Sequence, residues 1–297
     1  MEHEENVYDA LTEQHGADSQ WAFGTGIEDV QAEITSPVPD GVDPSDLAEY
    51  CLMLGDDALI AGHRLSEWVS NAPELEEEVA LANTALDLLG QARILLARAG
   101  HVEGAGRDED ALAYLRSEAQ FRNVALAEVG DDLDFARAVA RLLIFSSWRL
   151  ALLQRLLGSA DPVIAAVAGK GVKELAYHRD YAARWTLRLG DGTELSHARM
   201  QAALDGVWPY VEELFRISAV ERRLVEAGVA VDPADTRAEV DAVFDEVLAA
   251  ATLQRPQLPP IGTIAGRGGR QGVHTEQLGH VLAEMQSLAR QHPGATW

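Results

Sequence analysis

From Ser45 onward, apolar residues recur every three or four positions, and the strict apolar–polar alternation of a half-buried strand is absent. Residues three and four apart lie on one face of an α-helix, so this spacing gives each segment one apolar face. The pattern therefore predicts an all-α chain. Long helices joined by short breaks are expected to pack side by side as a helical bundle.

Breaks in this pattern divide the chain into eight predicted helices. They are expected over residues 45–69, 74–99, 108–128, 134–157, 162–189, 195–227, 233–252 and 274–292. The expected N-caps are Ser45 or Asp46, Asp132 or Asp134, Asp161, Asp232 and Thr275. Pro209 is expected to kink the sixth helix, and the Pro- and Gly-rich segment 255–272 is expected to be a loop.

Residues 1–44 differ in composition from the rest of the chain. They contain many small and acidic residues and no sustained period, apart from one weak helical pattern near 3–14. A segment of this kind has little apolar surface to bury, so it is predicted to be a disordered extension. Residues 45–297 are expected to form a single helical domain.

The chain is strongly acidic, with 24 basic and 48 acidic residues and a formal net charge of -24. Such a surface repels a phosphate backbone, which argues against nucleic-acid binding. Lys170 and Lys173 are the only lysines. Acid excess with scarce lysine is typical of proteins that work at high salt, where the repulsion is screened. A GC-rich genome is the alternative, and it explains the arginine but not the acid.

Several features favour a cytoplasmic protein without a membrane partner. No run reaches the roughly 18 uncharged apolar residues that a membrane span needs. The first ten residues are acidic and lack the basic and apolar regions of a secretion signal. Cys51 is the only cysteine, so an intrachain disulfide is impossible. Its apolar neighbours favour a core position over a nucleophilic one.

Asp87 is the only charged residue in the segment 79–92. With Asn83 and Gln91 it forms a polar stripe at four-residue spacing on an otherwise apolar helix. A carboxylate at this position is expected to point into the bundle or into a tight interface, where it needs a partner. Asp87 is therefore either a metal ligand or proton-handling acid, or a buried carboxylate satisfied by an arginine or a hydroxyl.

Glu174 and His178 lie four residues apart on one predicted helix and suggest half of a metal site. A di-iron site in a four-helix bundle takes one Glu from each of two helices and a Glu-x-x-His pair from each of the other two. Three residues after Glu174 stands Tyr177, and the corresponding histidine is also missing after Asp87. The segment 135–157 offers no acidic residue. The set of di-iron ligands is incomplete, so we expect no metal in this chain.

The first predicted helix carries a second polar stripe, formed by Asp56, His63 and Glu67. A zinc site would require His63 and Glu67 to meet His178, and nothing in the sequence forces them together. Solvated or ion-paired side chains are the competing interpretation.

Five segments resemble, in order, the family formed by the C subunits of the bacterial phenylacetyl-CoA epoxidase. They read YCLMLGDDALIAGHRLSEW, APELEEEVALANTALDLLGQAR, RSEAQFRN, KELAYHRDYAARWTLRLGDGT and the closing GVHTEQLGHVLAEMQSLARQHPGATW. The similarity extends roughly from Ala48 to Trp297. It does not extend to the segment before about residue 45, whose role stays open.

The resemblance implies a ferritin-like helical bundle with additional C-terminal helices. It also implies a place in a multicomponent monooxygenase that opens aerobic phenylacetate breakdown. That enzyme converts phenylacetyl-CoA to its ring 1,2-epoxide with O2 and electrons from NADPH. In the family, the di-iron centre lies in the catalytic A subunit, a small B subunit joins the complex, and a reductase with FAD and an iron–sulfur cluster delivers electrons.

The C subunit is the relative without metal ligands, and it pairs with the catalytic one as a structural part of the hetero-oligomer. The resemblance thus implies no catalytic residue and no cofactor in this chain, with Asp87, Glu174 and His178 as degenerate positions of a lost metal site. Two alternatives stay open. One is an independent ferritin-like metalloenzyme that uses the same three residues. The other is a CoA-thioester binding module in which Arg267 and Arg270 contact the anionic CoA or an acidic partner.

Overall fold

The computed structural model describes residues 33–130, 132–293 and 295. In this part of the chain the regular structure is helical, and extended pairing is limited to one isolated bridge between Ile264 and Arg267. The all-α prediction is therefore confirmed. The weak helix predicted near 3–14 and most of the predicted disordered extension lie outside the described residues.

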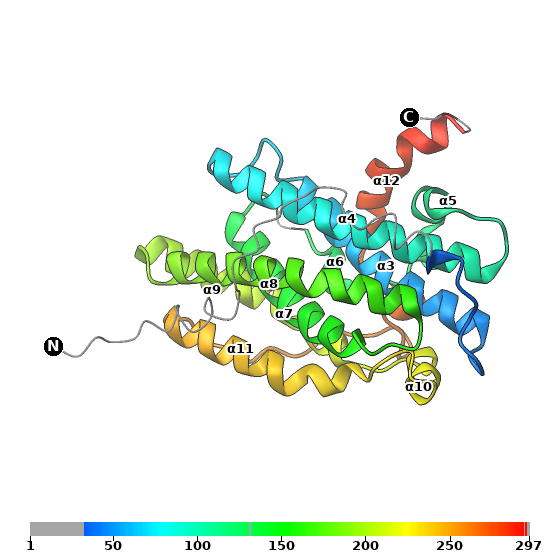
Figure 1. The fold of residues 1–297 in the computed structure, drawn as a ribbon. Helices are drawn as coiled ribbons and strands as arrows, with labels where there is room; N and C mark the ends of the chain where they lie inside the picture. Colours follow the sequence, from blue (N-terminus) through cyan, green and yellow to red (C-terminus); the bar gives the residue numbers. More distant parts are fainter. Residues whose placement is uncertain (1–32, 131, 294, 296–297) are drawn as a thin grey trace.

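Four long helices form the centre of the bundle (Figure 1). They are α3 (Pro44–Ser66), α4 (Leu75–Glu103), α7 (Phe135–Leu156) and α8 (Pro162–Gly190). The helix α3 packs along α4, α7 packs along α8, and contact between α4 and α8 joins the two pairs. This arrangement is the predicted ferritin-like bundle.

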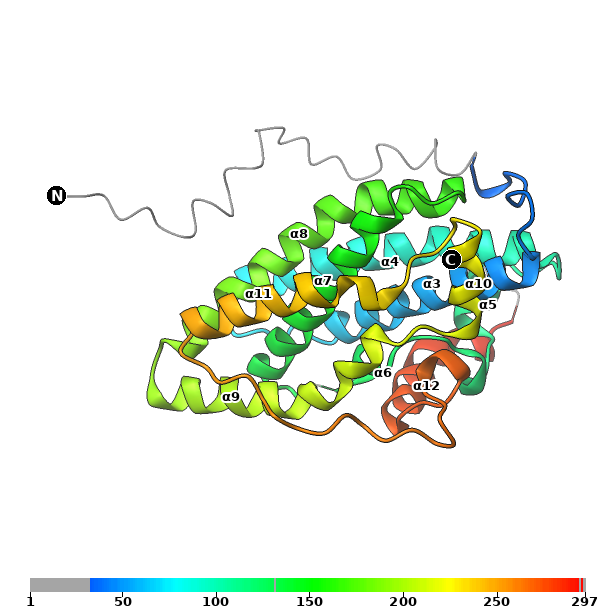
Figure 2. The ribbon, with the colours of Figure 1, turned by 90° about the horizontal axis from the view of Figure 1, so that it is seen from below.

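The remaining helices cover the central four (Figure 2). They are α5 (Glu109–Tyr114), α6 (Ala125–Glu128), α9 (Glu194–Val207), α10 (Ala219–Glu226), α11 (Arg237–Ala250) and α12 (Glu276–Gln291). Both α9 and α11 pack on α7 and α8, whereas α10 packs on α3. The last helix, α12, packs against α5, α6 and α3 at one end of the bundle.

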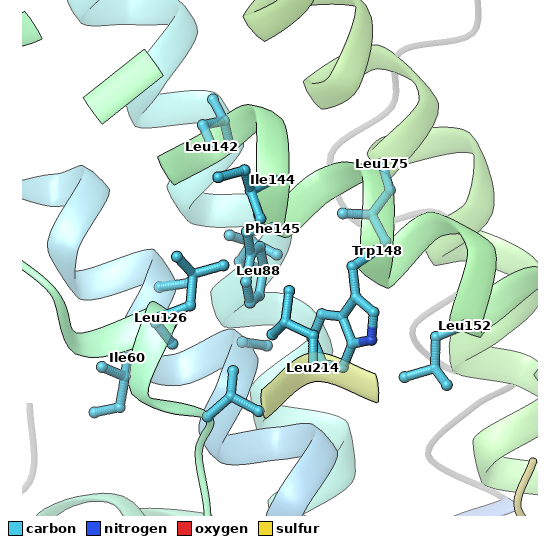
Figure 3. Close-up of a cluster of buried hydrophobic side chains, with 14 of the residues drawn as sticks. Ile60, Leu88, Leu126, Leu142, Ile144, Phe145, Trp148, Leu152, Leu175 and Leu214 are labelled. Atoms are coloured by element: carbon cyan, nitrogen blue, oxygen red, sulfur yellow. The ribbon is translucent and has the colours of Figure 1, made fainter. Parts of the chain in front are cut away.

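The core is built around the aromatic side chains of α7 (Figure 3). Phe145 and Trp148 lie edge to face with ring centroids 6.0 Å apart. Ile60 from α3, Leu88 from α4 and Leu175 from α8 belong to the same buried cluster. Each such apolar side chain contributes about 1.5–3 kcal/mol on burial, so the periodic apolar faces found in the sequence are what holds the helices together.

The helix predicted over 108–128 is wrong, because the chain forms α5, a 3₁₀ turn over Glu118–Gln120 and the short α6 instead. The intervening backbone is extended, and its N–H groups are bound by carboxylates of α3. Arg122 N–H donates to Asp56 and Val124 N–H donates to Asp57, each at 2.8 Å. These tertiary hydrogen bonds replace the ones that a continuous helix would have made.

The helix predicted over 195–227 is also interrupted, at the proline that was expected only to kink it. The helix α9 ends at Val207, and two 3₁₀ segments, Trp208–Tyr210 and Glu212–Phe215, follow. Pro209 has no N–H to donate, so the helical ladder is lost there. Ser218 then starts α10 with a capping box.

Helix starts follow the capping signals in most cases. Asp134 and Asp161 cap α7 and α8, as predicted. Asp43, rather than Ser45 or Asp46, caps α3 and accepts the Ser45 N–H at 2.8 Å. The earlier start is explained by proline at the first helical position, where its missing N–H carries no cost.

Among the described helices, α4 is long and apolar enough to cross a membrane, judged by length and composition only. The sequence criterion required an entirely uncharged run, and α4 does not meet it because Asp87 lies within the helix. Core helices of bundles pass the same test, and α4 packs along α3 and α8.

Candidate functional site

The candidate residues of α4 and α8 meet in a polar seam where the two helices run antiparallel. His178 Nε2 lies 3.0 Å from Asp87 Oδ2, and Gln91 Nε2 donates to Glu174 Oε2 at 2.9 Å. His178 and Gln91 are buried, whereas Asp87 and Glu174 keep part of their carboxylates at the surface. We call these four residues the α4–α8 seam. The three sequence-predicted positions are thus brought together, with Gln91 as the member that completes the seam.

A buried guanidinium from α7 reaches this seam from inside the bundle. Arg149 Nε donates to Gln91 Oε1 and Nη2 donates to the Leu54 carbonyl, both at 3.1 Å. Burial lowers the pKa of Arg149 to about 10, so it is still a cation at neutral pH. Its Nη1 has no hydrogen-bond partner among the described residues.

The seam residues do not fit a di-iron centre. Glu174 is engaged by Gln91 and, through its other oxygen, by Lys170 Nζ at 3.3 Å. The Arg149 guanidinium bonds Gln91 directly, and a buried cation in a medium of low dielectric disfavours a second, divalent one. Across the described chain no three His, Cys, Asp or Glu side chains are grouped so as to hold a metal ion.

The polar stripe predicted on the first helix separates into unrelated contacts. Asp56 is buried and pairs with Arg116, whose Nη1 lies 2.9 Å from Oδ2. Glu67 pairs with Arg64 at 2.8 Å. Burial lowers the pKa of His63, and its Nε2 is unpartnered within the described residues. These side chains therefore do not assemble with His178 into the zinc site considered above.

The two loop arginines lie in different environments. Arg267 is exposed, but Arg270 is buried, and its guanidinium contacts Asp57 at 2.8 and 3.0 Å. Arg270 also donates to the carbonyls of Met53 and Arg122 at 3.0 and 2.8 Å. The expectation that the pair offers two cations to one anionic ligand is not met in this structure, because Arg270 is used to attach the loop to α3.

Buried ion pairs between distant segments are the feature that sequence reasoning missed. Asp56 and Asp57 are neighbours in α3, and both are fully buried. Arg98 of α4 pairs with Asp161 at 2.6 Å, and it also donates to the carbonyls of Ile34 and Ser36. The one available signal was two adjacent acids in the otherwise apolar run from Tyr50 to Gly62 of the sequence.

His274 and Glu128 form another internal pair, between the start of the C-terminal segment and α6. His274 Nδ1 lies 3.1 Å from Glu128, and its Nε2 lies 3.1 Å from the Phe121 carbonyl. Both acceptors require N–H donors, so the ring is satisfied only as an imidazolium. Burial alone lowers the pKa of His274, but the hydrogen bond and charge of Glu128 outweigh it and raise the pKa above 6.5.

Together, the fold and the seam define a ferritin-like all-α protein in which the described interior is connected by ion pairs and hydrogen bonds rather than by a cluster of metal ligands. A family model described as phenylacetic acid catabolic protein matches residues 35–297, and the chain belongs to this family. Over 251 residues it is 44% identical to the protein of Escherichia coli strain K12 that is named as the C subunit of 1,2-phenylacetyl-CoA epoxidase. That match covers 84% of this chain and 99% of the E. coli protein.

Proposed function

We propose that this chain is the structural, non-catalytic subunit of a multicomponent phenylacetyl-CoA 1,2-epoxidase, and that it pairs with and stabilises the di-iron catalytic subunit. The E. coli relative, named as a C subunit, is matched over almost its whole length, which supports the place of this chain in such a complex. The observation that carries the non-catalytic role is the buried Arg149 guanidinium bonded to the α4–α8 seam.

The non-catalytic role is supported by the way the side chains of the α4–α8 seam bond one another. Asp87 and His178 bond each other, and Glu174 and Arg149 both bond Gln91. These side chains connect α4 to α7 and α8 by direct hydrogen bonds. Their role in this proposal is to hold the bundle rigid as a support, while oxygen chemistry takes place in the partner.

The same proposal assigns the remaining components. The di-iron centre belongs to the catalytic subunit, the complex is completed by a small third subunit, and a reductase carrying FAD and an iron–sulfur cluster supplies electrons from NADPH. The complex would work in the cytoplasm. The strongly acidic surface, with a net charge of -24, is consistent with protein partners and disfavours nucleic acid.

The test is to express this chain and the catalytic subunit, separately and together. Iron and manganese are measured by mass spectrometry, and epoxide formation from phenylacetyl-CoA is measured with the reductase and NADPH present. We expect the isolated chain to be metal-free and inactive, the pair to co-elute in size exclusion, and activity to require the catalytic subunit. Stoichiometric metal together with activity in the isolated chain would establish an independent metalloenzyme instead. A chain that elutes separately from the catalytic subunit would contradict the pairing.

A further inference from the structure

The outer face of α4 is apolar, and the described part of the chain leaves it exposed. Val79 is 51% exposed and Leu86 is 48% exposed, and both lie on the same side of the helix, seven residues apart. At Gly90, one turn further on, an added Cβ would meet no atom of the described chain within 4 Å. Only 44% of the most apolar 18-residue window of α4 is buried, so much of this apolar helix faces outward. An exposed stripe of this kind indicates a surface that another molecule covers.

An aromatic pocket on α8 lies beside this stripe. Tyr181 Oη and Trp185 Nε1 both donate to Glu77 Oε2 of α4, at 2.6 and 2.7 Å. Tyr177, which is 49% exposed, lines the same pocket, whose volume is about 150 Å³. The Glu77 contacts keep the two rings in place, so the pocket is preformed rather than created by a ligand. A pocket of this size accommodates one side chain of a partner.

The stripe and the pocket form one surface because the α4–α8 seam lies between them. Tyr177 precedes His178, whose ring bonds Asp87 of α4, the residue that follows Leu86. We call the surface that contains Val79, Leu86, Gly90, Tyr177 and the aromatic pocket the α4–α8 outer face.

The helix α8 is net basic, whereas the chain as a whole is acidic. Two of its cations are paired within the helix, Lys170 with Glu174 and Arg184 with Asp180. The helix α8 carries both lysines of the protein, Lys170 and Lys173, and both are exposed. Arg184 and Arg188 are exposed on the same helix and line the aromatic pocket. In a chain with 48 acidic and 24 basic residues, this basic edge selects a partner surface edged with carboxylates.

We propose that the α4–α8 outer face is the docking surface for the catalytic subunit, which presents an apolar helical face with an acidic edge. This inference rests on the proposed function. Tyr, Trp and Arg side chains around a preformed pocket are the composition of interface hot spots. A lipid surface is disfavoured, because three consecutive glutamates, Glu76 to Glu78, begin α4 and the net charge of -24 repels anionic headgroups.

The experiment measures the affinity of the full chain for the catalytic subunit, by titration calorimetry or analytical ultracentrifugation. Leu86→Asp and Tyr177→Ala each remove one apolar contact from the proposed surface, and we expect the Kd to rise about 30-fold or more, as for hot-spot truncations. Leu288→Asp is the matched control, since Leu288 is 52% exposed in the last turn of α12. It should bind like the wild type. Thermal melting followed by circular dichroism establishes that all three variants are folded.

Charge is tested separately with Lys173→Glu, compared with Arg222→Glu on the exposed surface of α10. We expect Lys173→Glu to slow association at low salt, with the difference disappearing at 1 M KCl, where the Debye length is about 3 Å. Arg222→Glu should leave the association rate unchanged at every salt concentration. Equal rates for Lys173→Glu and the wild type at low salt would overturn the basic edge as a recognition element.

The outcomes separate this inference from the proposed function. If the wild-type chain does not bind the catalytic subunit, the proposed function fails. If the wild type binds and Leu86→Asp and Tyr177→Ala bind equally well, this face is not the interface. If Leu86→Asp abolishes only self-association, the face belongs to a homodimer. If the wild type binds vesicles of phosphatidylserine and phosphatidylcholine and Leu86→Asp does not, the α4–α8 outer face is a membrane-binding surface. Each of the last three results overturns the proposal.

Discussion

At the scale of single residues, buried ion pairs join segments that lie far apart in the sequence. Asp57 is fully buried, and burial raises its pKa even though the Arg270 guanidinium acts in the opposite direction. A carboxylate in this position depends on its partner, because an isolated buried charge is far more costly than a paired one. The loop that carries Arg270 is thus fixed to α3 by one side chain.

Replacing Arg270 by methionine should lower the free energy of unfolding by about 3–5 kcal/mol at pH 7, since it leaves the Asp57 carboxylate buried and unpaired. Urea denaturation measures the loss, which should shrink as the pH falls and Asp57 becomes protonated. Adding Asp57→Asn should recover part of the stability. Arg155→Met is the control, because its pair with Glu239 is partly exposed and such pairs contribute about 1 kcal/mol or less. Similar losses in the two single variants would contradict this account.

His274 predicts a stability that depends on pH in a defined direction. Its folded-state pKa is raised, so the stabilisation is complete below the ordinary value of 6.5 and is lost as the pH rises through the folded-state pKa. Relative to His274→Gln, the wild type should gain about 1.5–3 kcal/mol at pH 5.5, the range for a hydrogen bond to a charged group, and less at pH 9. Urea melts at several pH values measure the difference.

His63 is the internal control for this measurement. Burial lowers its pKa, so the folded state resists protonation, and the wild type should lose stability relative to His63→Gln as the pH falls below 6.5. The two histidines therefore give slopes of opposite sign. Parallel slopes would show that a global charge effect, and not these two side chains, sets the pH dependence.

At the scale of elements, local signals predicted helices well and tertiary contacts decided where they broke. The starts of α7 and α8 follow directly from Asp134 and Asp161, because a cap acts within one turn. The interruption between α5 and α6 was not visible, because Asp56 and Asp57 lie more than sixty residues away and bind the backbone there. The spacing of apolar residues within 108–128 gives no indication of that contact.

Two glycines of α4 give opposite predictions for the same substitution. Gly90→Ala adds a methyl group to open space and removes backbone entropy from the unfolded chain, so it should stabilise the isolated protein by about 0.5–1 kcal/mol. Gly100→Ala places its Cβ against the Arg107 backbone carbonyl and should be destabilising. Chemical denaturation of both variants provides the comparison. A loss of stability in Gly90→Ala would mean that the outer side of α4 is covered in the isolated chain.

At the scale of the whole molecule, the sequence indicated which residues form the candidate site more clearly than it indicated their hydrogen-bond partners. The spacing of Glu174 and His178 identified the correct face of α8, and the isolated charge of Asp87 identified α4. Their assembly with Gln91 and Arg149 depends on how α4, α7 and α8 pack, which periodicity does not specify. The resemblance to the phenylacetyl-CoA epoxidase C subunits indicated the family of the chain, which residue spacing alone could not do. The family match over residues 35–297 confirms this membership.

The net charge of -24 gives the last prediction, which concerns all of the protein at once. Twice as many acidic as basic residues repel one another in the compact state more than in the expanded one, so repulsion lowers stability at low ionic strength. Salt shortens the Debye length from about 10 Å at 0.1 M to about 3 Å at 1 M and screens this term. The melting temperature should therefore rise by roughly 1.5–3 °C between 0.1 and 1 M KCl, which corresponds to about 1–2 kcal/mol for a chain of 297 residues. NaCl of equal ionic strength serves as the control, because it screens charge to the same extent, whereas sucrose would stabilise the fold by itself. If the melting temperature does not rise in either salt, repulsion within the acidic surface is not what limits stability.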